Sequence, residues 1–196
     1  LTMETGIQDC YDVVVAGAGP AGSSLAIRLA TSGLSVLLVE QKRFPREKLC
    51  GEFISPECIT HFQELGVSAE ITEAGAIPLL ETVFYSRSGK GVSIQSEWFG
   101  TAGSYALGLS RGEMDRMLME RAGSVGVDVR DETSVGSLLI ENARVVGVKI
   151  KNKFGRSAEV VAKLMVDATG RTRSLARRFK TRIDATGPAK HVAFKT

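Results

Sequence analysis

The sequence predicts an α/β fold built around a parallel sheet, from two short apolar runs and the segment that joins them. Residues 13–16 (VVVA) and 36–39 (VLLV) are continuous apolar runs, which are typical of strands covered on both faces. Between them, residues 25–30 are apolar at helical spacing, and Gly33 is a natural helix end. A strand–helix–strand unit of this size predicts a right-handed crossover between parallel strands.

The segment GAGPAG, residues 17–22, fits the pattern G-x-G-x-x-G between the first strand and the helix. In such a turn Gly17 makes the tight bend, Gly19 admits a pyrophosphate to the backbone, and Gly22 lets helix and strand pack closely. The N–H groups at the helix N-terminus also favour an anion. The strand–helix–strand setting favours this Rossmann-like interpretation over a glycine-rich turn that binds no ligand.

Glu40 ends the second strand about 20 residues after the glycines, where a carboxylate can accept hydrogen bonds from both hydroxyls of an adenosine ribose. A carboxylate at this position repels a 2′-phosphate, so the sequence disfavours NADP here. A solvated strand-end glutamate is the alternative interpretation. The expected ligand carries an adenosine diphosphate group, and FAD and NAD both remain open.

The middle of the chain predicts a loop at 41–51, a short helix from Pro56 to Leu65, and an inserted β-rich region at 74–108. A second long helix follows at 110–123. Ser110 and Glu113 have the spacing of a capping box at its start.

The last part of the chain predicts a strand at 127–129 and then a small antiparallel β-meander. The meander strands are expected at 138–140, 145–150 and 160–161. A separate strand at 164–166 is expected to end on Asp167, at the sheet edge where ligands of α/β proteins bind.

Composition excludes several classes of protein. The 196 residues have a net charge of +3 and no long basic run, so the sequence predicts no nucleic-acid partner. Three cysteines without a CxxC pair and two histidines, His61 and His191, predict neither a disulfide framework nor a metal site. No apolar stretch is long enough for an integral membrane segment, and no signal peptide is apparent. We expect a cytoplasmic protein, with peripheral membrane association left open.

Four segments together resemble the N-terminal half of FAD-dependent oxidoreductases. They are DVVVAGAGPAGSSLAIRLATSGLSVLLVEQ, FPREKLCGE, LSRGEMDRML and VDATGRTRSLARR, in this order. The group they resemble contains para-hydroxybenzoate hydroxylase-like monooxygenases, flavin-dependent halogenases and geranylgeranyl reductases. PREKLCGE is most similar to the geranylgeranyl reductase and halogenase-like branch.

The resemblance implies that the cofactor is FAD, with Glu40 on the adenosine ribose. It also implies that Arg46 and Lys48 approach the diphosphate or the flavin edge and that Arg111 lies over the adenine-diphosphate half, although a solvated basic loop is the alternative. Asp167 and the residues after it resemble the family's second cofactor-binding motif. The expected cofactor-binding residues are Gly17, Ala18, Gly19, Pro20, Ala21, Gly22, Glu40, Gln41, Arg46, Lys48, Cys50, Gly51, Arg111, Asp167, Ala168 and Gly170.

Cys50 is the one catalytic candidate, because a cysteine in this loop faces the flavin and the substrate cavity in the reductases that the chain resembles. Neighbouring basic residues favour a reactive thiol. A small buried side chain is the alternative, since that is the commoner role of cysteine.

The resemblance implies a Rossmann-like FAD-binding fold that is incomplete, because the family's third motif, a Gly-Asp pair, lies beyond residue 196. We expect residues 1–74 and 101–182 to form a discontinuous FAD-binding domain. Residues 75–100 and 183–196 would begin a substrate-binding region. The flavin end of the site would need the missing C-terminal half or a partner chain.

The resulting hypothesis is an FAD-dependent oxidoreductase, of the monooxygenase or the reductase type, that acts on a small apolar substrate. NADH or NADPH is the expected reductant. The competing hypothesis is a dinucleotide-binding module, or an inactive N-terminal fragment, that binds without turnover.

Overall fold

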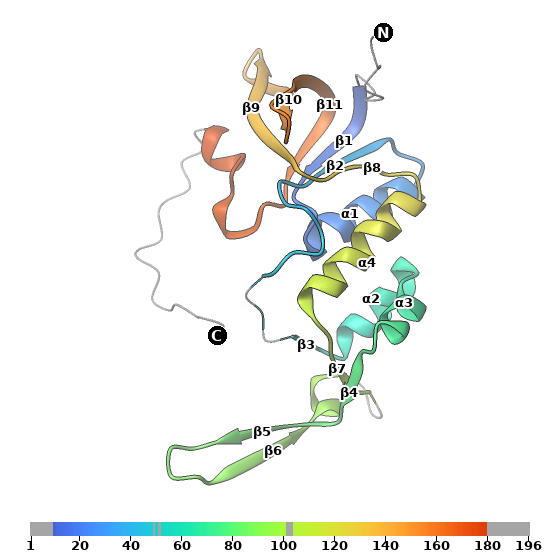
Figure 1. Ribbon diagram of the computed structural model, residues 1–196, viewed down its shortest axis with the longest axis vertical. Coiled ribbons are helices and arrows are strands. Elements are labelled where there is room, and N and C mark those ends of the chain that lie inside the picture. The colour runs from blue at the N-terminus through green and yellow to red at the C-terminus, as the bar shows by residue number, and fades with distance from the viewer. Residues whose placement is uncertain (1–9, 49, 51, 101–103, 180–196) are drawn as a thin grey trace.

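The computed structural model describes residues 10–48, 50, 52–100 and 104–179, which form three sheets and the helices packed on them (Figure 1). The strands are β1 (Cys10–Ala16), β2 (Val36–Val39), β3 (Phe53–Ile54), β4 (Ile77–Leu79), β5 (Glu81–Tyr85), β6 (Gly91–Gln95), β7 (Ala106–Gly108), β8 (Asp128–Arg130), β9 (Thr133–Glu141), β10 (Arg144–Asn152) and β11 (Ser157–Asp167). The α-helices are α1 (Pro20–Thr31), α2 (Glu57–Leu65), α3 (Ser68–Glu73) and α4 (Arg111–Ser124). Short 3₁₀-helices are η1 (Ser96–Phe99), η2 (Gly170–Thr172) and η3 (Ala176–Phe179).

The largest sheet has the strand order β8-β2-β1-β11-β10-β9. Strands β8, β2, β1 and β11 are parallel, whereas β10 and β9 are antiparallel to their neighbours. Val14 of the central strand β1 lies opposite Leu37 on one side and Met165 on the other. The predicted α/β fold, with its parallel sheet and its antiparallel meander, is therefore confirmed.

One strand assignment from the sequence is wrong. Residues 160–161 and 164–166 were expected in separate strands, but β11 runs without a break from Ser157 to Asp167. Its first half pairs antiparallel with β10, and its second half pairs parallel with β1. Lys163, which lies between the two expected strands, is exposed, and its ammonium contacts Asp12 at 2.6 Å. An outward charge is compatible with a continuous strand because side chains alternate between faces.

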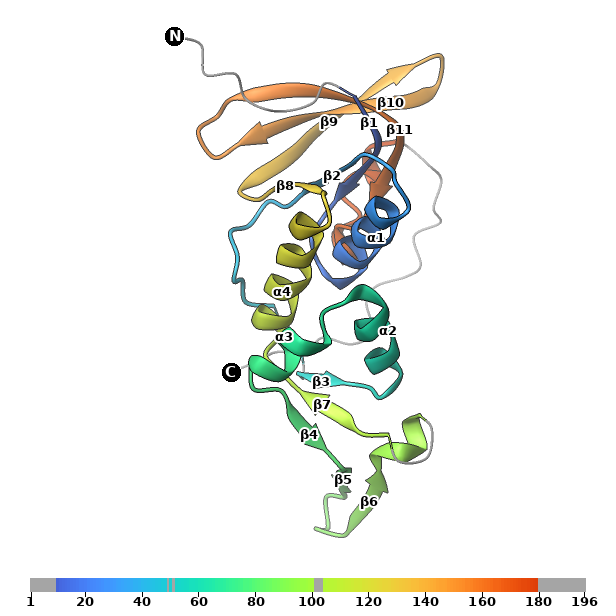
Figure 2. The ribbon, with the colours of Figure 1, turned by 90° about the vertical axis from the view of Figure 1, so that its right-hand side faces the viewer.

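The large sheet is covered on both faces. Helices α1 and α4 lie side by side on one face, where residues such as Val15, Ile27 and Leu118 form a core (Figure 2). On the other face, Val14 and Leu37 pack in a second core with residues of β10 and β11. This burial on both faces explains why β1 and β2 are continuously apolar. Among the described residues, no helix combines the length and the apolar character that crossing a membrane requires.

The inserted region lies away from the large sheet, as Figures 1 and 2 show. Strands β3, β7 and β4 form a small sheet beneath α2 and α3, and the hairpin β5–β6 extends beyond it. Large apolar side chains of this hairpin and of η1 are exposed, among them Phe84, Tyr85, Val92 and Trp98. The predicted β-rich insertion is thus present.

The start of α4 differs from the prediction. Ser110 is the N-cap residue, but its hydroxyl makes no capping hydrogen bond. Glu113 does not complete a capping box, and its carboxylate pairs with Arg116 at 2.9 Å. An arginine three residues away on the same helix face is a competing partner for the glutamate that the sequence pattern does not take into account.

Candidate dinucleotide-binding site

The glycine turn, residues 17–22, connects β1 to α1 at the carboxyl edge of the large sheet. Gly17 has a φ of +103°, and a Cβ at this position would lie 2.5 Å from the carbonyl oxygen of Ala168. A Cβ on Gly22 would lie 1.8 Å from the carbonyl oxygen of Gly17. Both contacts are with backbone atoms, which cannot move aside cheaply. The fold itself therefore requires glycine at positions 17 and 22.

Gly19 is different, because the fold leaves room for a side chain there. Its φ is −77°, which any residue can adopt. The nearest atoms to a Cβ at this position would be Nη2 of Arg46 at 3.5 Å and Nη2 of Arg111 at 3.8 Å, both ordinary contact distances. The backbone of Gly19 thus faces two guanidinium groups. Packing of the fold does not require glycine at this position.

The N-terminus of α1 begins at this glycine. Gly19 is the N-cap residue and Pro20 occupies the first turn, where a missing N–H costs nothing. No side chain of the described residues caps the helix, and its first turn contains no acidic residue. Uncapped N–H groups and the positive end of the helix dipole together favour an anion beside Gly19.

Glu40 is buried next to the glycine turn and has acceptor capacity left. One carboxylate oxygen accepts a hydrogen bond from the N–H of Ala18 at 3.0 Å, and the other accepts one from the N–H of Lys42 at 2.9 Å. A carboxylate offers about four acceptor positions. These two amides fix the carboxylate at the strand end and leave positions for other donors. Nη2 of Arg46 lies 3.7 Å away, as an ion pair.

Arg46 and Arg111 approach Gly19 from different parts of the chain, and one acid lies between them. Asp115 is fully buried on α4, and its carboxylate accepts a hydrogen bond from Nε of Arg111 at 2.7 Å. Its other oxygen lies 3.3 Å from Nη2 of Arg46. The guanidinium of Arg46 also lies 5.1 Å from the ring centre of Phe44, in cation–π geometry. The Nε of Arg46 is buried without a hydrogen-bond partner among the described residues.

Arg111 remains positively charged despite its partial burial. Burial alone would lower its pKa, but the hydrogen bond and the charge of Asp115, together with the contact to Cys50, raise the pKa above its ordinary value. Two fixed positive charges therefore face the uncapped end of α1. Guanidinium groups suit phosphate oxygens because they can donate two parallel hydrogen bonds.

The aspartate turn, residues 167–176, follows the adjacent strand β11 and uses its acid internally. One oxygen of Asp167 accepts hydrogen bonds from the N–H and the hydroxyl of Thr169, at 3.0 and 2.6 Å. The other accepts them from the N–H groups of Leu175 and Ala176, both at 2.9 Å. Burial alone would raise the pKa of Asp167, but these hydrogen bonds lower it. All four donors belong to the turn, so this carboxylate holds the turn together.

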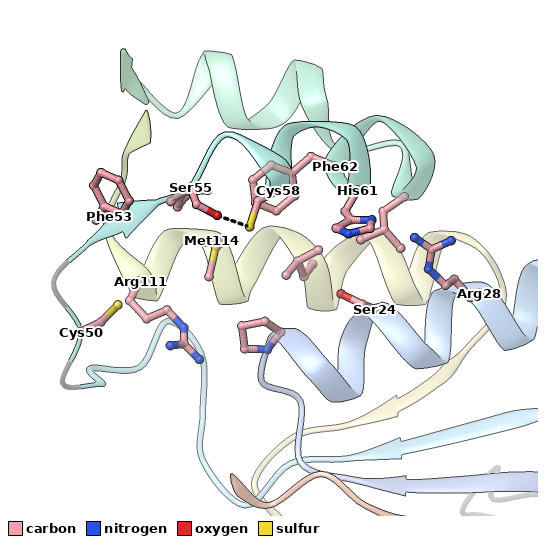
Figure 3. A pocket seen from close by; sticks show the side chains of 14 residues that line it. Ser24, Arg28, Cys50, Phe53, Ser55, Cys58, His61, Phe62, Arg111 and Met114 are labelled. Carbon is pink, nitrogen blue, oxygen red and sulfur yellow. Dashed lines mark hydrogen bonds between the residues drawn. The ribbon is translucent and has the colours of Figure 1, made fainter. Parts of the chain in front are cut away.

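A cavity of about 530 Å³ opens beside the site, between α1, α2, α4 and β3 (Figure 3). Its wall is mainly apolar, with Phe53, Phe62 and Met114 among the lining side chains. Cys50 and Arg111 also line it. Figure 3 shows these two side chains next to each other, on the side of the loop between β2 and β3. The cavity therefore shares Arg111 with the anion-binding groups around Gly19.

The structure brings most of the predicted residues to one edge of the sheet. Gly17, Ala18, Gly19, Pro20, Glu40, Arg46 and Arg111 gather around the start of α1. Gln41 and Lys48 are exposed on the following loop, and Gly51 lies outside the described residues. Among the described residues, no group of three His, Cys, Asp or Glu side chains is placed to hold a metal ion.

Sequence reasoning missed Asp115, which connects the two arginines. Two signals in the sequence point to it. Asp115 lies four residues after Arg111, and in the sequence it lies between two apolar residues, Met114 and Met117. A buried acid requires a partner, so an arginine one turn earlier was the natural candidate.

Comparisons with known proteins give relatives that are named as a reductase and as a chlorinase. The chain is 34% identical over 165 residues to the digeranylgeranylglycerophospholipid reductase of Methanosarcina acetivorans, covering 84% of this chain and 39% of the relative. It is 31% identical over 191 residues to the 1H-pyrrole-2-carbonyl-[peptidyl-carrier protein] chlorinase of Pseudomonas fluorescens, covering 88% of this chain and 42% of the relative. The chain thus spans about two fifths of the length of these curated relatives.

A solved structure has the same fold. The myxobacterial chondrochloren halogenase, described as a variant of FAD-dependent halogenases, superposes with a TM-score of 0.79 at 29% identity, covering 87% of this chain and 40% of the halogenase. The family model described as an FAD binding domain matches residues 10–195. The chain, with its glycine turn, its strand-end glutamate and its paired arginines, therefore belongs to the FAD binding domain family.

Proposed function

We propose that this chain binds the adenosine diphosphate half of FAD at the glycine turn. The observation that supports it best is the convergence of two guanidinium groups on Gly19, the one glycine of the motif that packing does not require. The uncapped end of α1 adds further positive potential there. Glu40, held by two backbone amides beside this point, keeps acceptor capacity for the ribose hydroxyls.

The predicted residues take different parts in this proposal. Gly19 and the first turn of α1 contact the diphosphate through the backbone, and Arg46 and Arg111 contact it through their side chains. The carboxylate of Asp167 is fully engaged within the aspartate turn, so it does not contact the cofactor. Ala168 and Gly170 contribute through their backbone. Lys48 would approach the diphosphate or the flavin edge, Cys50 would face the flavin, and Gln41 would contact the cofactor beside Glu40.

We further propose an FAD-dependent oxidoreductase that acts on a small apolar molecule. When bound, FAD supplies the redox chemistry, and the residues of this chain bind and orient it. The apolar cavity that shares Arg111 and Cys50 with the site supports an apolar substrate. Residues 1–74 and 101–182 would form the FAD-binding part, and 75–100 and 183–196 the start of the substrate-binding part. NADH or NADPH would be the reductant.

A binding module without turnover is the second candidate. The groups around Gly19 and Glu40 suit the binding of a dinucleotide and do not by themselves require turnover. Purified protein that binds FAD, and whose flavin absorption is bleached by NADH or NADPH, would support the oxidoreductase. Flavin that binds but is reduced only by dithionite would support the module.

Glu40→Gln tests the adenosine site itself. The substitution keeps the size of the side chain. It removes the negative charge of the carboxylate that would accept hydrogen bonds from the ribose hydroxyls. A hydrogen bond to a charged group contributes about 1.5–3 kcal/mol, so we expect the affinity for FAD and for ADP to fall by tenfold or more, as measured by flavin fluorescence quenching and calorimetry.

The matched control is Glu47→Gln, which neutralises an exposed acid in the loop that follows. This variant is expected to bind FAD and ADP like the unmodified chain. An unmodified chain that binds neither ligand would refute the proposed function, and an unchanged affinity in Glu40→Gln would refute the ribose contact.

A further inference from the structure

Asp115 is a buried charge whose only close partners among the described residues are the two arginines of the site. Its exposure is 0%, and it lies in the second turn of α4. One oxygen is hydrogen-bonded to Nε of Arg111, and the other makes an ion pair with Arg46 but has no hydrogen-bond partner. Burying a carboxylate is costly unless it is paired. This acid is therefore unlike the exposed acids of α4, which pair along the helix surface.

The geometry joins two elements that are far apart in the sequence. Arg46 comes from the loop after β2, and Arg111 comes from the start of α4. The Nη2 atoms of both arginines nevertheless lie next to Gly19. Two guanidinium groups at one point repel each other. The carboxylate between them offsets this repulsion, and its hydrogen bond to Nε leaves the Nη2 of Arg111 directed toward Gly19.

We propose that Asp115 is a positioning residue, which holds Arg46 and Arg111 in the arrangement that receives the diphosphate. This inference rests on the proposed function, since it concerns the diphosphate part of the same site. Asp115 does not contact the ligand itself. It acts by aiming two donors that belong to different elements at the bare backbone of Gly19.

Asp115→Asn separates positioning from simple attraction. The amide keeps the shape of the side chain, and its oxygen can still accept the hydrogen bond from Arg111. However, the NH₂ group of the amide must face one of the two arginines. It faces the Nη2 of Arg46 in one orientation and the Nε of Arg111 in the other, and both of these atoms are donors. The variant gains one positive charge, so attraction alone predicts tighter binding of ADP. Positioning predicts that ADP binds about tenfold more weakly.

The readout is the ratio of the affinities for ADP and for adenosine, measured by calorimetry on the 196-residue chain. Adenosine lacks the diphosphate, so its affinity is expected to stay unchanged in Asp115→Asn. A purely structural role would weaken both ligands together and would refute the proposal, as would an unchanged or tighter binding of ADP. Glu120→Gln is the matched control, because Glu120 is an exposed acid of α4 paired with Arg116 at 2.6 Å.

Arg111→Lys covers the case in which Asp115→Asn does not fold, as judged by circular dichroism. Lysine keeps the charge, but its single ammonium group cannot both bind Asp115 and reach toward Gly19 in the same fork geometry. We expect the same loss in the ADP to adenosine ratio, and an unchanged ratio would refute the proposal. An unmodified chain that binds neither ADP nor adenosine would instead refute the proposed function.

Discussion

The glycine turn and the aspartate turn lie at the carboxyl ends of adjacent parallel strands, and each lies next to a strand-end acid. Glu40 accepts hydrogen bonds from two backbone amides and keeps acceptor positions for other donors. Asp167 accepts four hydrogen bonds, all from its own turn. Of the two acids at this edge of the sheet, Glu40 beside the glycine turn therefore keeps acceptor positions, whereas Asp167 in the aspartate turn has none left.

The two turns also pack against each other. Gly17 packs against the backbone of Ala168, and a Cβ on Gly22 would lie 3.2 Å from the Cβ of Ala168. The aspartate turn packs against the glycine turn, and the four hydrogen bonds to its own acid hold it together. Because the aspartate turn packs against it, the glycine turn can leave its backbone N–H groups directed toward a ligand.

Gly22→Ala is expected to have the largest effect on stability, because its new side chain would clash with the carbonyl oxygen of Gly17 inside the glycine turn. The new Cβ would lie 1.8 Å from a backbone oxygen, so the helix or the turn must move. We expect the free energy of unfolding to fall by on the order of 3 kcal/mol, measured by urea denaturation. A loss smaller than that of Gly19→Ala would contradict the packing argument.

Asp167→Asn is expected to have the next largest effect and to act on stability more than on binding. The amide cannot accept all four hydrogen bonds, and its NH₂ group would face backbone donors. We expect a loss of about 2 kcal/mol in the free energy of unfolding. The ADP to adenosine affinity ratio should change little, in contrast to Asp115→Asn.

The pH dependence of unfolding provides a check on this role of Asp167. Its pKa in the folded chain lies below its ordinary value of 3.8. The carboxylate therefore stabilises the fold above that ordinary value, and this contribution is lost as the pH falls through the folded pKa. Compared with the unmodified chain, Asp167→Asn should show a flatter loss of stability in acid. Parallel acid profiles would show that the hydrogen bonds to Asp167 do not stabilise the fold.

Gly19→Ala is expected to have the smallest effect on stability. Its φ suits alanine and its Cβ would make only ordinary contacts, so the free energy of unfolding should stay within about 1 kcal/mol of the original. The affinity for ADP should nevertheless fall about tenfold, because the added methyl group occupies the space into which both guanidinium groups project. Calorimetry with ADP and urea denaturation together measure both effects. Unchanged ADP affinity would place the diphosphate elsewhere.

Much of the fold could be predicted because its signals are local. The apolar runs of β1 and β2 and the glycine that ends α2 each reflect short-range backbone and burial preferences. The continuity of β11 could not be predicted in this way. It depends on pairing with β10 at one end and with β1 at the other, and these partners are distant in the sequence.

The sequence by itself determined the strand–helix–strand unit, the three glycines and the acid that ends β2, because spacing along one chain fixes them. Only the tertiary structure decided which strand-end acid stays available to a ligand, since that depends on donors from residues 169–176 folding back onto Asp167. It also decided that Arg46 joins the local pair of Arg111 and Asp115. A buried charge finds its partners through space, and no local pattern reports which distant side chain will arrive there.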